Sequence, residues 1–268
     1  TDCSEYSGDC YSFMFVYSGN FVGQAEVDQI SQTRVVMGMQ GEHFSWKLEP
    51  GEEFQCPEVI LGYSSEGFQK LSDNQHRIIR EHVCRGKFKY DRRPVIINNW
   101  EATYFDFDDK KILAFAKSAG ELGIEMFVLD DGWFGERNSD LSGLGDWYVN
   151  QDKVKCGRKG LTDQRKHLGM EFGIWLEPER VSENRQLYKR HPEWCLHMEH
   201  RKGVRSRYQY VLDMANTEVM EYLYQSICDI LDSANIRYVK WDMNRHLSNV
   251  WSCTLPSDRQ GEVWHRYM

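Results

Sequence analysis

Between residues 126 and 133 the chain reads Met126-Phe127-Val128-Leu129-Asp130-Asp131-Gly132-Trp133. Four apolar residues lead directly into two carboxylates, a glycine and a tryptophan, a pattern that predicts a buried strand ending at a polar edge. Three other short, largely apolar runs end in the same way. They are Val95-Ile96-Ile97 before Asn98-Asn99-Trp100, Met170-Glu171-Phe172-Gly173-Ile174-Trp175 before Leu176-Glu177, and Tyr238-Val239-Lys240-Trp241 before Asp242.

Segments with helical periodicity separate these predicted strands. Apolar residues recur at helical spacing over residues 112–122, 159–168 and 219–234. Strands that alternate with helices predict a parallel sheet, and the carboxyl edge of that sheet carries the active site in (β/α)8 barrels. We therefore interpret residues 86–268 as the first half of such a barrel, about strands one to four. A closed barrel takes roughly 250 residues, so we expect a truncated barrel and a chain that is a fragment.

The first 85 residues have a different pattern. Short β-rich runs broken by Gly and Asn predict antiparallel strands. These runs are residues 11–17, 19–23, 33–38, 44–48 and 59–63. Residues 66–84 carry apolar residues at helical spacing, and the charged residues 85–93 follow as a connector. We interpret residues 1–85 as the C-terminal portion of an N-terminal β-sandwich domain with a helical connector, so that the fold class is α/β plus β.

The charge of the chain argues against several classes of partner. There are 33 Lys+Arg against 41 Asp+Glu, which gives a formal net charge of −8, and basic residues form no long run. Binding to nucleic acid or to an anionic membrane needs a basic face. The sequence also contains no apolar run of about 18 residues that could cross a membrane. We expect neither nucleic acid nor membrane as a partner.

The cysteines and the absence of familiar motifs narrow the chemistry. Eight cysteines are scattered without CxxC pairs or zinc-like spacing to histidine. They predict free thiols in a reducing compartment, and hence a cytoplasmic protein, with disulfides as the alternative. The sequence has no Gly-rich phosphate loop, no GxSxG elbow and no HExxH motif. We expect neither a metal nor a cofactor.

The ends of the predicted strands bring charged and aromatic residues to one edge of the sheet. Sugar hydroxyls need charged hydrogen-bond partners, and the C–H faces of a sugar stack on indole rings. The set therefore predicts a sugar as the ligand. Its members are Trp100, Asp130, Asp131, Trp133, Trp175, Glu177, Lys240, Asp242 and Asn244.

Each of these residues also has a purely structural interpretation. Asp130 and Asp131 could cap a helix that follows the strand. Lys240 and Asp242 could form a salt bridge at the end of their strand. The tryptophans could pack in the core, and the two glutamates on either side of Pro178 could serve only the electrostatics of their loop.

Four segments resemble glycoside hydrolase family 36, the bacterial and fungal α-galactosidases. They are Asp130-Asp131-Gly132-Trp133-Phe134, Gly145-Asp146-Trp147, Gly173-Ile174-Trp175-Leu176-Glu177-Pro178-Glu179 and Lys240-Trp241-Asp242-Met243-Asn244-Arg245. They occur in the family's order, and the resemblance runs from about residue 20 to the end. It implies an enzyme that removes terminal α-linked galactose from melibiose- or raffinose-type oligosaccharides with retention, without metal or cofactor, as a homo-oligomer, a tetramer.

The resemblance also implies roles for individual residues. Asp242 corresponds to the nucleophile, which forms a covalent galactosyl intermediate. Lys240 and Asn244 point to the same side of the strand as Asp242 by the period-two rule, which places a cation and an amide beside the nucleophile. The remaining substrate-binding residues implied are Asp130 and Asp131 for galactose hydroxyls, Trp175 for the pocket wall, Arg207 for the sugar or a carboxylate, and Trp100 as a subsite aromatic.

One part of the family pattern is missing. The acid/base aspartate belongs to a later motif resembling Ser-Asp-Asp-Thr-Asp, and the only carboxylates after Asp242 are Asp258 and Glu262, in a stretch expected to run away from the site. Retaining hydrolysis needs a second carboxyl about 5 to 5.5 Å from the first. We therefore expect this chain alone to be inactive. Two alternatives are a galactosyltransferase similar to raffinose and stachyose synthases and a non-catalytic, truncated sugar-binding protein.

Overall fold

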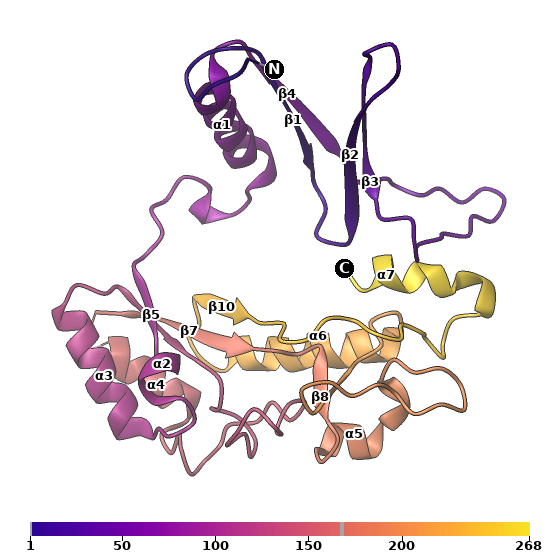
Figure 1. Ribbon diagram of the computed structural model, residues 1–268. Coiled ribbons are helices and arrows are strands. Elements are labelled where there is room, and N and C mark those ends of the chain that lie inside the picture. Colours follow the sequence, from indigo (N-terminus) through magenta and orange to yellow (C-terminus); the bar gives the residue numbers. More distant parts are fainter. Residues whose placement is uncertain (1, 167–168) are drawn as a thin grey trace. The chain divides into compact units, whose positions relative to one another are not determined.

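The computed structural model describes residues 2–166 and 169–268 and divides into two compact units (Figure 1). The first unit contains the chain up to Arg93 together with Asp258–Arg266 and Met268. The second unit contains Pro94–Ser257 and Tyr267. Each unit has its own set of strands and helices.

This division differs from the predicted boundary between residues 85 and 86. Residues 86–93 belong to the first unit, where the Lys89 ammonium donates to the Glu81 carbonyl oxygen at 2.6 Å. Residues 258–266 also belong to the first unit and not to the barrel-like part. The Lys47 ammonium lies 2.7 Å from the Asp258 carboxylate, and the Lys47 backbone N–H donates to Glu262 at 3.2 Å. These long-range polar contacts cannot be inferred from the local pattern of either segment.

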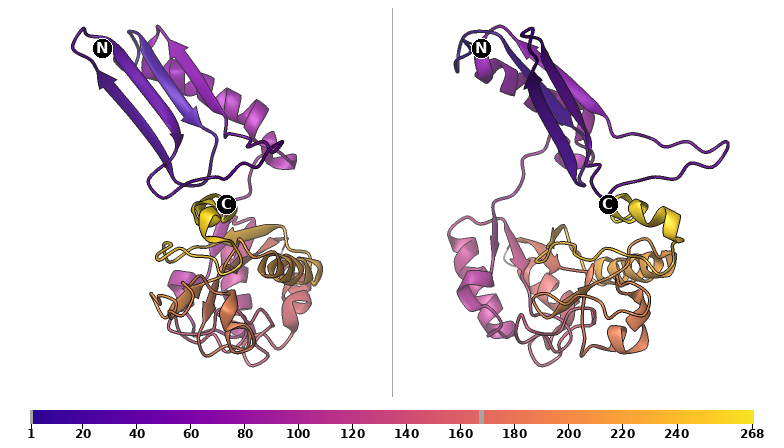
Figure 2. Two further views of the ribbon diagram at one scale, coloured as in Figure 1. Left: turned by 90° about the vertical axis from the view of Figure 1, so that its right-hand side faces the viewer. Right: turned by 45° about the vertical axis from the view of Figure 1, so that its right-hand side comes forward.

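The first unit consists of two antiparallel strand pairs and a helix. Strand β1 (Cys10–Phe15) pairs with β4 (Val59–Ser64), and β2 (Phe21–Val27) pairs with β3 (Thr33–Met39). The two pairs lie side by side, and helix α1 (Gly67–Ile78) packs on β4 and β1 (Figure 2). The prediction of antiparallel strands followed by a helix is confirmed. The minor elements of this unit are a π-helical turn η1 (Ile79–Val83), the 3-10 turns η2 (Lys87–Lys89) and η4 (Ser257–Glu262), and α7 (Val263–Arg266).

The strand predicted at residues 44–48 is wrong. This segment, which lies wholly within the described part of the chain, is irregular. Its tryptophan belongs to an aromatic cluster, because the Trp46 ring lies 4.9 Å from the Phe54 ring and 5.5 Å from the His265 ring. The alternation of apolar and polar residues therefore reflects an aromatic cluster and not a half-buried strand.

The second unit is built on a parallel sheet with strand order β10-β7-β6-β5. The strands are β5 (Ile96–Asn98), β6 (Met126–Leu129), β7 (Glu171–Leu176) and β10 (Tyr238–Trp241). The longer helices between them in sequence are α3 (Asp109–Glu121), α4 (Gly157–Lys166) and α6 (Thr217–Asp232). All four predicted strands and all three predicted helices exist. The last two residues of the helix predicted over 159–168 lie outside the described residues.

Local capping explains where two of these helices begin. The Asp108 carboxylate accepts from the Lys111 backbone N–H before α3, and the Asn216 side chain accepts from the Glu218 N–H before α6. Side-chain oxygens at this position satisfy the otherwise unpaired N–H groups of the first helical turn.

Several short elements of the second unit were not predicted. They are the helices α2 (Trp100–Thr103) and α5 (Gln186–Arg190), the 3-10 turn η3 (Pro192–Trp194), and the antiparallel strands β8 (Arg180–Ser182) and β9 (Gln209–Val211). A strand of three residues is too short to show an alternating pattern in the sequence. Strands β8 and β9 are also far apart in the sequence, so their pairing depends on tertiary contacts.

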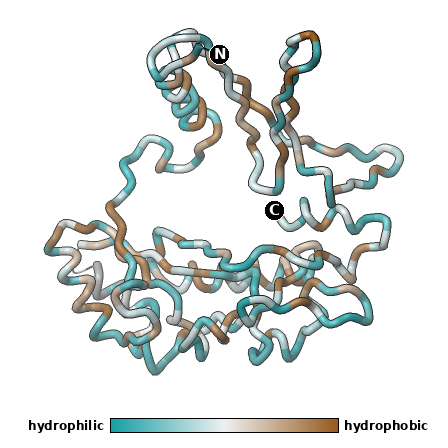
Figure 3. The backbone as a smooth tube through the Cα atoms, viewed as in Figure 1, coloured by the Kyte–Doolittle hydropathy of each residue, from teal (hydrophilic) through white to brown (hydrophobic). Residues whose placement is uncertain are grey.

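The core of the second unit lies between the sheet and its helices. All four side chains of β6 are buried, as are most of those of β7. Figure 3 shows the hydrophobic colouring of the chain at β5, where it enters the sheet. Trp133 is fully buried and donates its indole N–H to the Trp175 carbonyl oxygen at 2.9 Å. Trp133 is therefore a core residue, which agrees with the interpretation that the tryptophans pack in the core.

Two further properties bear on the expectations from the sequence. Within residues 2–166 and 169–268, no helix combines the length and apolar character needed to cross a membrane. The eight cysteines are free thiols, which excludes the disulfide alternative for this structure.

Candidate active site

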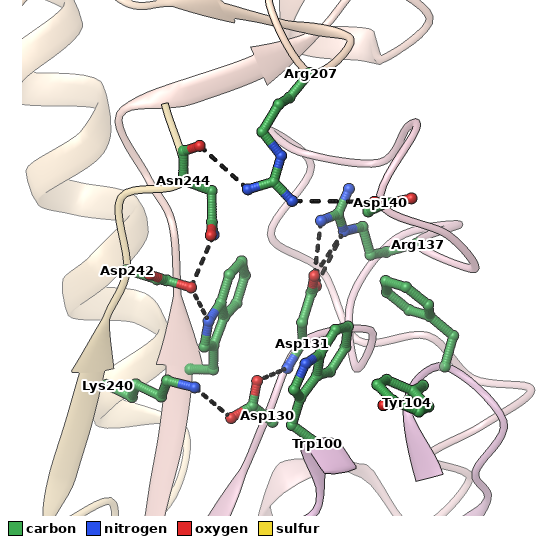
Figure 4. Close-up of a pocket in the computed structure, with 12 residues that line it drawn as sticks. Trp100, Tyr104, Asp130, Asp131, Arg137, Asp140, Arg207, Lys240, Asp242 and Asn244 are labelled. Carbon is green, nitrogen blue, oxygen red and sulfur yellow. Dashed lines mark hydrogen bonds and ion pairs between the residues drawn. The ribbon is translucent and has the colours of Figure 1, made fainter. Parts of the chain in front are cut away.

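A pocket of about 430 Å³ lies at the carboxyl ends of the parallel strands of the second unit (Figure 4). The eight residues to which the family resemblance assigns a role all line it, namely Trp100, Asp130, Asp131, Trp175, Arg207, Lys240, Asp242 and Asn244. Trp133 and Glu177, which belong to the predicted strand-end set, do not line it. Four more lining residues were not predicted, namely Tyr104, Phe105, Arg137 and Asp140. The rule that strand ends meet at one edge therefore located the pocket, whereas the loops between strands complete it.

The Asp242 carboxylate is held by three N–H groups. Its Oδ2 accepts from the Trp175 indole N–H at 3.0 Å and from the Asn244 side-chain amide at 2.8 Å. Its Oδ1 accepts from the Met243 backbone N–H at 2.9 Å. The Asp242 backbone N–H donates to the Leu176 carbonyl oxygen at 2.8 Å, which extends the β10–β7 ladder by one residue. The carboxylate is thus fixed by both strands.

Lys240 points into the same pocket, as the period-two rule predicts, but its ion-pair partner is Asp130. The ammonium lies 2.8 Å from Asp130 Oδ2, and the Lys240 side chain is 35% exposed against 3% for Asp130. The pair spans β10 and β6, with β7 between them. The interpretation of Lys240 and Asp242 as a salt bridge within one strand end is therefore wrong, and the cation instead neutralises a buried carboxylate in the pocket wall.

Asp131 forms a buried, bidentate ion pair with Arg137. The guanidinium donates from Nε to Oδ1 at 3.0 Å and from Nη2 to Oδ2 at 2.7 Å, and the side chains are 8% and 3% exposed. Burial raises the pKa of the Asp131 carboxyl, and the charge and hydrogen bonds of Arg137 act in the opposite direction. No sequence pattern pointed to Arg137, because this residue lies in an irregular loop six residues after its partner.

The turn after Asp131 depends on a glycine. Gly132 has a φ of +97°, and a Cβ atom at this position would lie 2.9 Å from the Phe105 ring. The backbone turns here so that Asp130 and Asp131 face the pocket while Trp133 enters the core. The next helix after Asp131 begins only at Gly157, so neither aspartate caps a helix.

Aromatic residues form one wall of the pocket. Trp100, at the start of α2, makes edge-to-face contacts with Tyr104 and Phe105 at ring-centroid distances of 5.2 and 5.1 Å. Tyr104 has a φ of +45°, an uncommon conformation for a residue with a side chain. Trp175 is almost fully buried, and its indole N–H is directed at Asp242. The wall offers indole surface next to the carboxylates, as a sugar-binding site requires.

Arg207 reaches the pocket from an exposed segment. Its Nη1 donates to the Asn244 carbonyl oxygen at 3.1 Å, and its Nη2 lies 4.0 Å from the Asp140 carboxylate. Arg207 and Tyr208 are consecutive residues with positive φ, +49° and +60°. Such conformations cost of order 1–3 kcal/mol each and persist only where the surrounding structure holds them in place. The guanidinium is available to a ligand, because its side chain is 47% exposed.

The two glutamates around Pro178 have separate roles. Glu177 is fully buried, and its carboxylate accepts from the Asn244 backbone N–H at 2.7 Å and from the Asn244 side chain at 3.1 Å. Burial raises its pKa, and the nearby Asp242 charge acts in the same direction. Glu179 accepts from the Tyr267 hydroxyl and from the Trp241 indole N–H, neither of which lines the pocket. Glu177 is therefore linked to the site, whereas Glu179 belongs to the surrounding network.

The two carboxylates that follow Asp242 in sequence are engaged within the first unit. Asp258 pairs with Lys47, and Glu262 is fully buried and pairs with Arg259 at 3.3 Å and Arg266 at 2.8 Å. Neither lines the pocket. Among the residues that the structure describes, no three His, Cys, Asp or Glu side chains gather in a group that could hold a metal ion.

The second unit is thus an α/β protein whose parallel sheet carries carboxylates, a lysine and indole groups in one pocket at its carboxyl edge. The family model described as Melibiase matches residues 53–268, and the model of the glycosyl hydrolase family 36 N-terminal domain matches residues 1–49. The chain therefore belongs to glycoside hydrolase family 36, the melibiases. The likeness extends to the N-terminal residues, beyond the part that the sequence motifs cover.

Known proteins resemble the chain closely. Alpha-galactosidase AgaA of Geobacillus stearothermophilus is 51% identical over 267 residues, which cover 100% of this chain and 37% of AgaA. The crystal structure of AgaA matches with a TM-score of 0.97 at 50% identity, again over 100% of this chain and 37% of the other. An AgaA variant in complex with raffinose matches with a TM-score of 0.96 at 50% identity and the same coverage. The chain thus spans about 37% of the length of these relatives.

Proposed function

We propose that the full-length protein carrying this chain is a retaining α-galactosidase that releases terminal α-linked galactose from melibiose- or raffinose-type oligosaccharides. The observation that carries the proposal is the Asp242 carboxylate, fixed by Trp175 and Asn244 in an acidic, aromatic pocket at the edge of the parallel sheet. This substrate class is supported by a relative named alpha-galactosidase and by the structure of its variant in complex with raffinose.

In the proposed mechanism Asp242 is the nucleophile. One carboxylate oxygen attacks the anomeric carbon of galactose while the bond to the leaving oxygen breaks, which gives a covalent galactosyl ester. The leaving oxygen takes a proton from a second carboxylic acid, which then, as a base, removes a proton from the water that cleaves the ester. Asp130 and Asp131 each have a cationic partner, so we assign the acid to the part of the protein outside this chain.

The other pocket residues would bind the sugar. In Figure 4, Lys240 and Asp130 lie together below Asp242, and the Asp131 side chain points toward Arg137. The three residues offer both donors and acceptors to galactose hydroxyls. Arg207 would reach the sugar from the exposed side, because its side chain is 47% exposed. Trp100 would face the C–H surface of the sugar, as aromatic rings commonly do in carbohydrate sites. Trp175 is almost fully buried and would line the pocket wall while it holds the Asp242 carboxylate.

Replacing Asp242 by asparagine tests the proposal. In the full-length protein, the Asp242→Asn variant should lose at least about 10³-fold in kcat on a nitrophenyl α-galactoside, since removing a covalent nucleophile leaves only binding and electrostatics. Asp229→Asn, a change of the same kind on the exposed face of α6, is the matched control and should retain full activity. Normal turnover by Asp242→Asn would contradict the assignment. Product analysis with sucrose as acceptor separates hydrolysis from galactosyl transfer.

We also propose the larger architecture to which this chain contributes. Strands β5, β6, β7 and β10 would be strands one to four of a (β/α)8 barrel, and the first unit part of a β-sandwich domain. The exposed side chains along the β10 edge, where Tyr238 and Trp241 are 40% and 50% exposed, support a further neighbouring strand. Free cysteines support a reducing, cytoplasmic location. The tetrameric state rests on the family resemblance and is testable by light scattering on the full-length protein.

A further inference from the structure

We propose that Glu177 is a positioning residue, which fixes the Asn244 amide so that its N–H points at the Asp242 carboxylate. This inference rests on the proposed role of Asp242 as nucleophile and adds a residue that does not itself reach the pocket. Glu177 is fully buried and is not among the lining residues. Any effect of Glu177 on a sugar must therefore be transmitted through another side chain.

The strand geometry brings Glu177 and Asn244 together. Strands β7 and β10 are parallel neighbours, with Leu176 opposite Trp241 in register. The chain continues past this pair on both strands, so that Glu177 and Asp242 follow directly. The Asn244 backbone N–H then donates to Glu177 Oε1 at 2.7 Å, which fixes the main chain two residues after the nucleophile. Glu177 thus secures the loop that carries Asn244.

The side-chain amide of Asn244 has two carboxylate acceptors. Its Nδ2 lies 3.1 Å from Glu177 Oε2 and 2.8 Å from Asp242 Oδ2. An ionised carboxylate only accepts hydrogen bonds. If the amide rotated by half a turn, its own carbonyl oxygen would face acceptors without a hydrogen between them. The ionised Glu177 carboxylate therefore leaves one orientation for the amide, and in that orientation an N–H is directed at Asp242.

Replacing Glu177 by glutamine removes this constraint with almost no change in volume. The new amide can present its own N–H₂ to Asn244, which permits the rotated amide and sets an oxygen against Asp242. A hydrogen bond to a charged group contributes roughly 1.5–3 kcal/mol, which corresponds to a decrease of about 10- to 100-fold in kcat. KM and the dissociation constant of galactose should change by less than about 3-fold, because Glu177 does not contact the sugar.

A double-mutant cycle in the full-length protein tests the inference. Glu177→Gln and Asn244→Ala should each lower kcat on a nitrophenyl α-galactoside, and the double variant should be no slower than Asn244→Ala within about 2-fold, because Glu177 acts through Asn244. Glu179→Gln is the matched control, since it removes a neighbouring carboxylate whose partners do not line the pocket; its kcat should stay within about 3-fold of the parent.

Two outcomes would overturn the inference. One is a kcat of Glu177→Gln within 3-fold of the parent protein, and the other is a double variant in which the two losses multiply. If Glu177→Gln does not fold, Glu177→Asp replaces it in the cycle, because the shorter side chain draws the carboxylate away from Asn244, whose amide it contacts at 3.1 Å, and should show the same non-additivity. Asp242→Asn, assayed in parallel, separates the two proposals: full activity there refutes the nucleophile assignment, and with it the inference, whatever the cycle gives.

Discussion

Replacing Arg137 by methionine should leave the Asp131 carboxylate buried without its counter-ion. The guanidinium makes three N–H contacts with this carboxylate at 3.0, 3.1 and 2.7 Å, and neither side chain is more than 8% exposed. Removing one partner of a buried ion pair costs about 3–5 kcal/mol, because the remaining charge is desolvated and unpaired. Methionine fills a similar volume, so that the loss of charge dominates over the creation of a cavity.

Native-state amide hydrogen exchange, followed by mass spectrometry, measures this loss. The method reports the free energy of local opening segment by segment, which suits a protein with more than one structural unit. In Arg137→Met, the opening free energy of peptides covering residues 126–150 should fall by about 3–5 kcal/mol. The double variant Arg137→Met with Asp131→Asn should recover more than half of that loss, because no charge remains unpaired. An opening free energy of Arg137→Met within about 1 kcal/mol of the parent would refute the argument.

The loss should also depend on pH. Burial raises the pKa of Asp131 above its value in the unfolded chain, so the folded state holds the proton to higher pH than the unfolded state. The contribution of such an acid to stability falls as the pH rises from about 4 through the folded-state pKa. Without Arg137 the upward shift grows, so the deficit of Arg137→Met should be small near pH 4 and should increase toward neutral pH.

Galactose binding, the pH dependence of stability and the activity of the 268-residue chain provide three more tests. Lys240→Met should weaken galactose binding by about 10- to 100-fold in calorimetry, because Asp130 loses its charged partner and the sugar a donor; unchanged affinity would contradict the pairing. Burial raises the pKa of Glu177, so the unfolding free energy of the parent protein should decline relative to that of Glu177→Gln as the pH rises from about 4. A difference between the two proteins that does not change with pH would contradict the raised pKa. The 268-residue chain alone should not hydrolyse a nitrophenyl α-galactoside, because each carboxylate other than Asp242 among the described lining residues has a cationic partner; measurable turnover would show that the acid lies within the chain.

The sequence predicted the sheet and its edge because both depend on short-range patterns. Apolar runs of strand length and helical periodicity between them are local properties, so the strand predicted at 126–129 has the bounds of β6 and the run ending in Asp242 matches β10. The residues that follow these strands meet in one pocket, since parallel strands share a carboxyl edge. Arg207 and the subsite position of Trp100 came from the family resemblance, and both residues line the pocket. Their roles toward a sugar remain predictions.

Local sequence patterns did not predict the contacts between distant loops. Arg137 and Asp140 lie in an irregular loop with no periodicity, and the β8–β9 pair joins residues about 30 positions apart. The strand predicted at 44–48 is wrong because the aromatic residues of this stretch, Phe44 and Trp46, pack on Phe54 and not on a neighbouring strand. The partner of Lys240 was also unforeseen, since the ammonium crosses β7 to reach Asp130 instead of staying beside Asp242. In each case tertiary packing decides the outcome.

Trapping of the glycosyl-enzyme tests the nucleophile assignment most directly. A fluorinated galactosyl fluoride that forms the covalent intermediate faster than water cleaves it should label the full-length protein once per chain. Peptide mass spectrometry should locate the label on Asp242, in the peptide that follows β10, and Asp242→Asn should remain unlabelled. A label on any other carboxylate, or steady turnover of galactosides with no label at Asp242, would contradict the account.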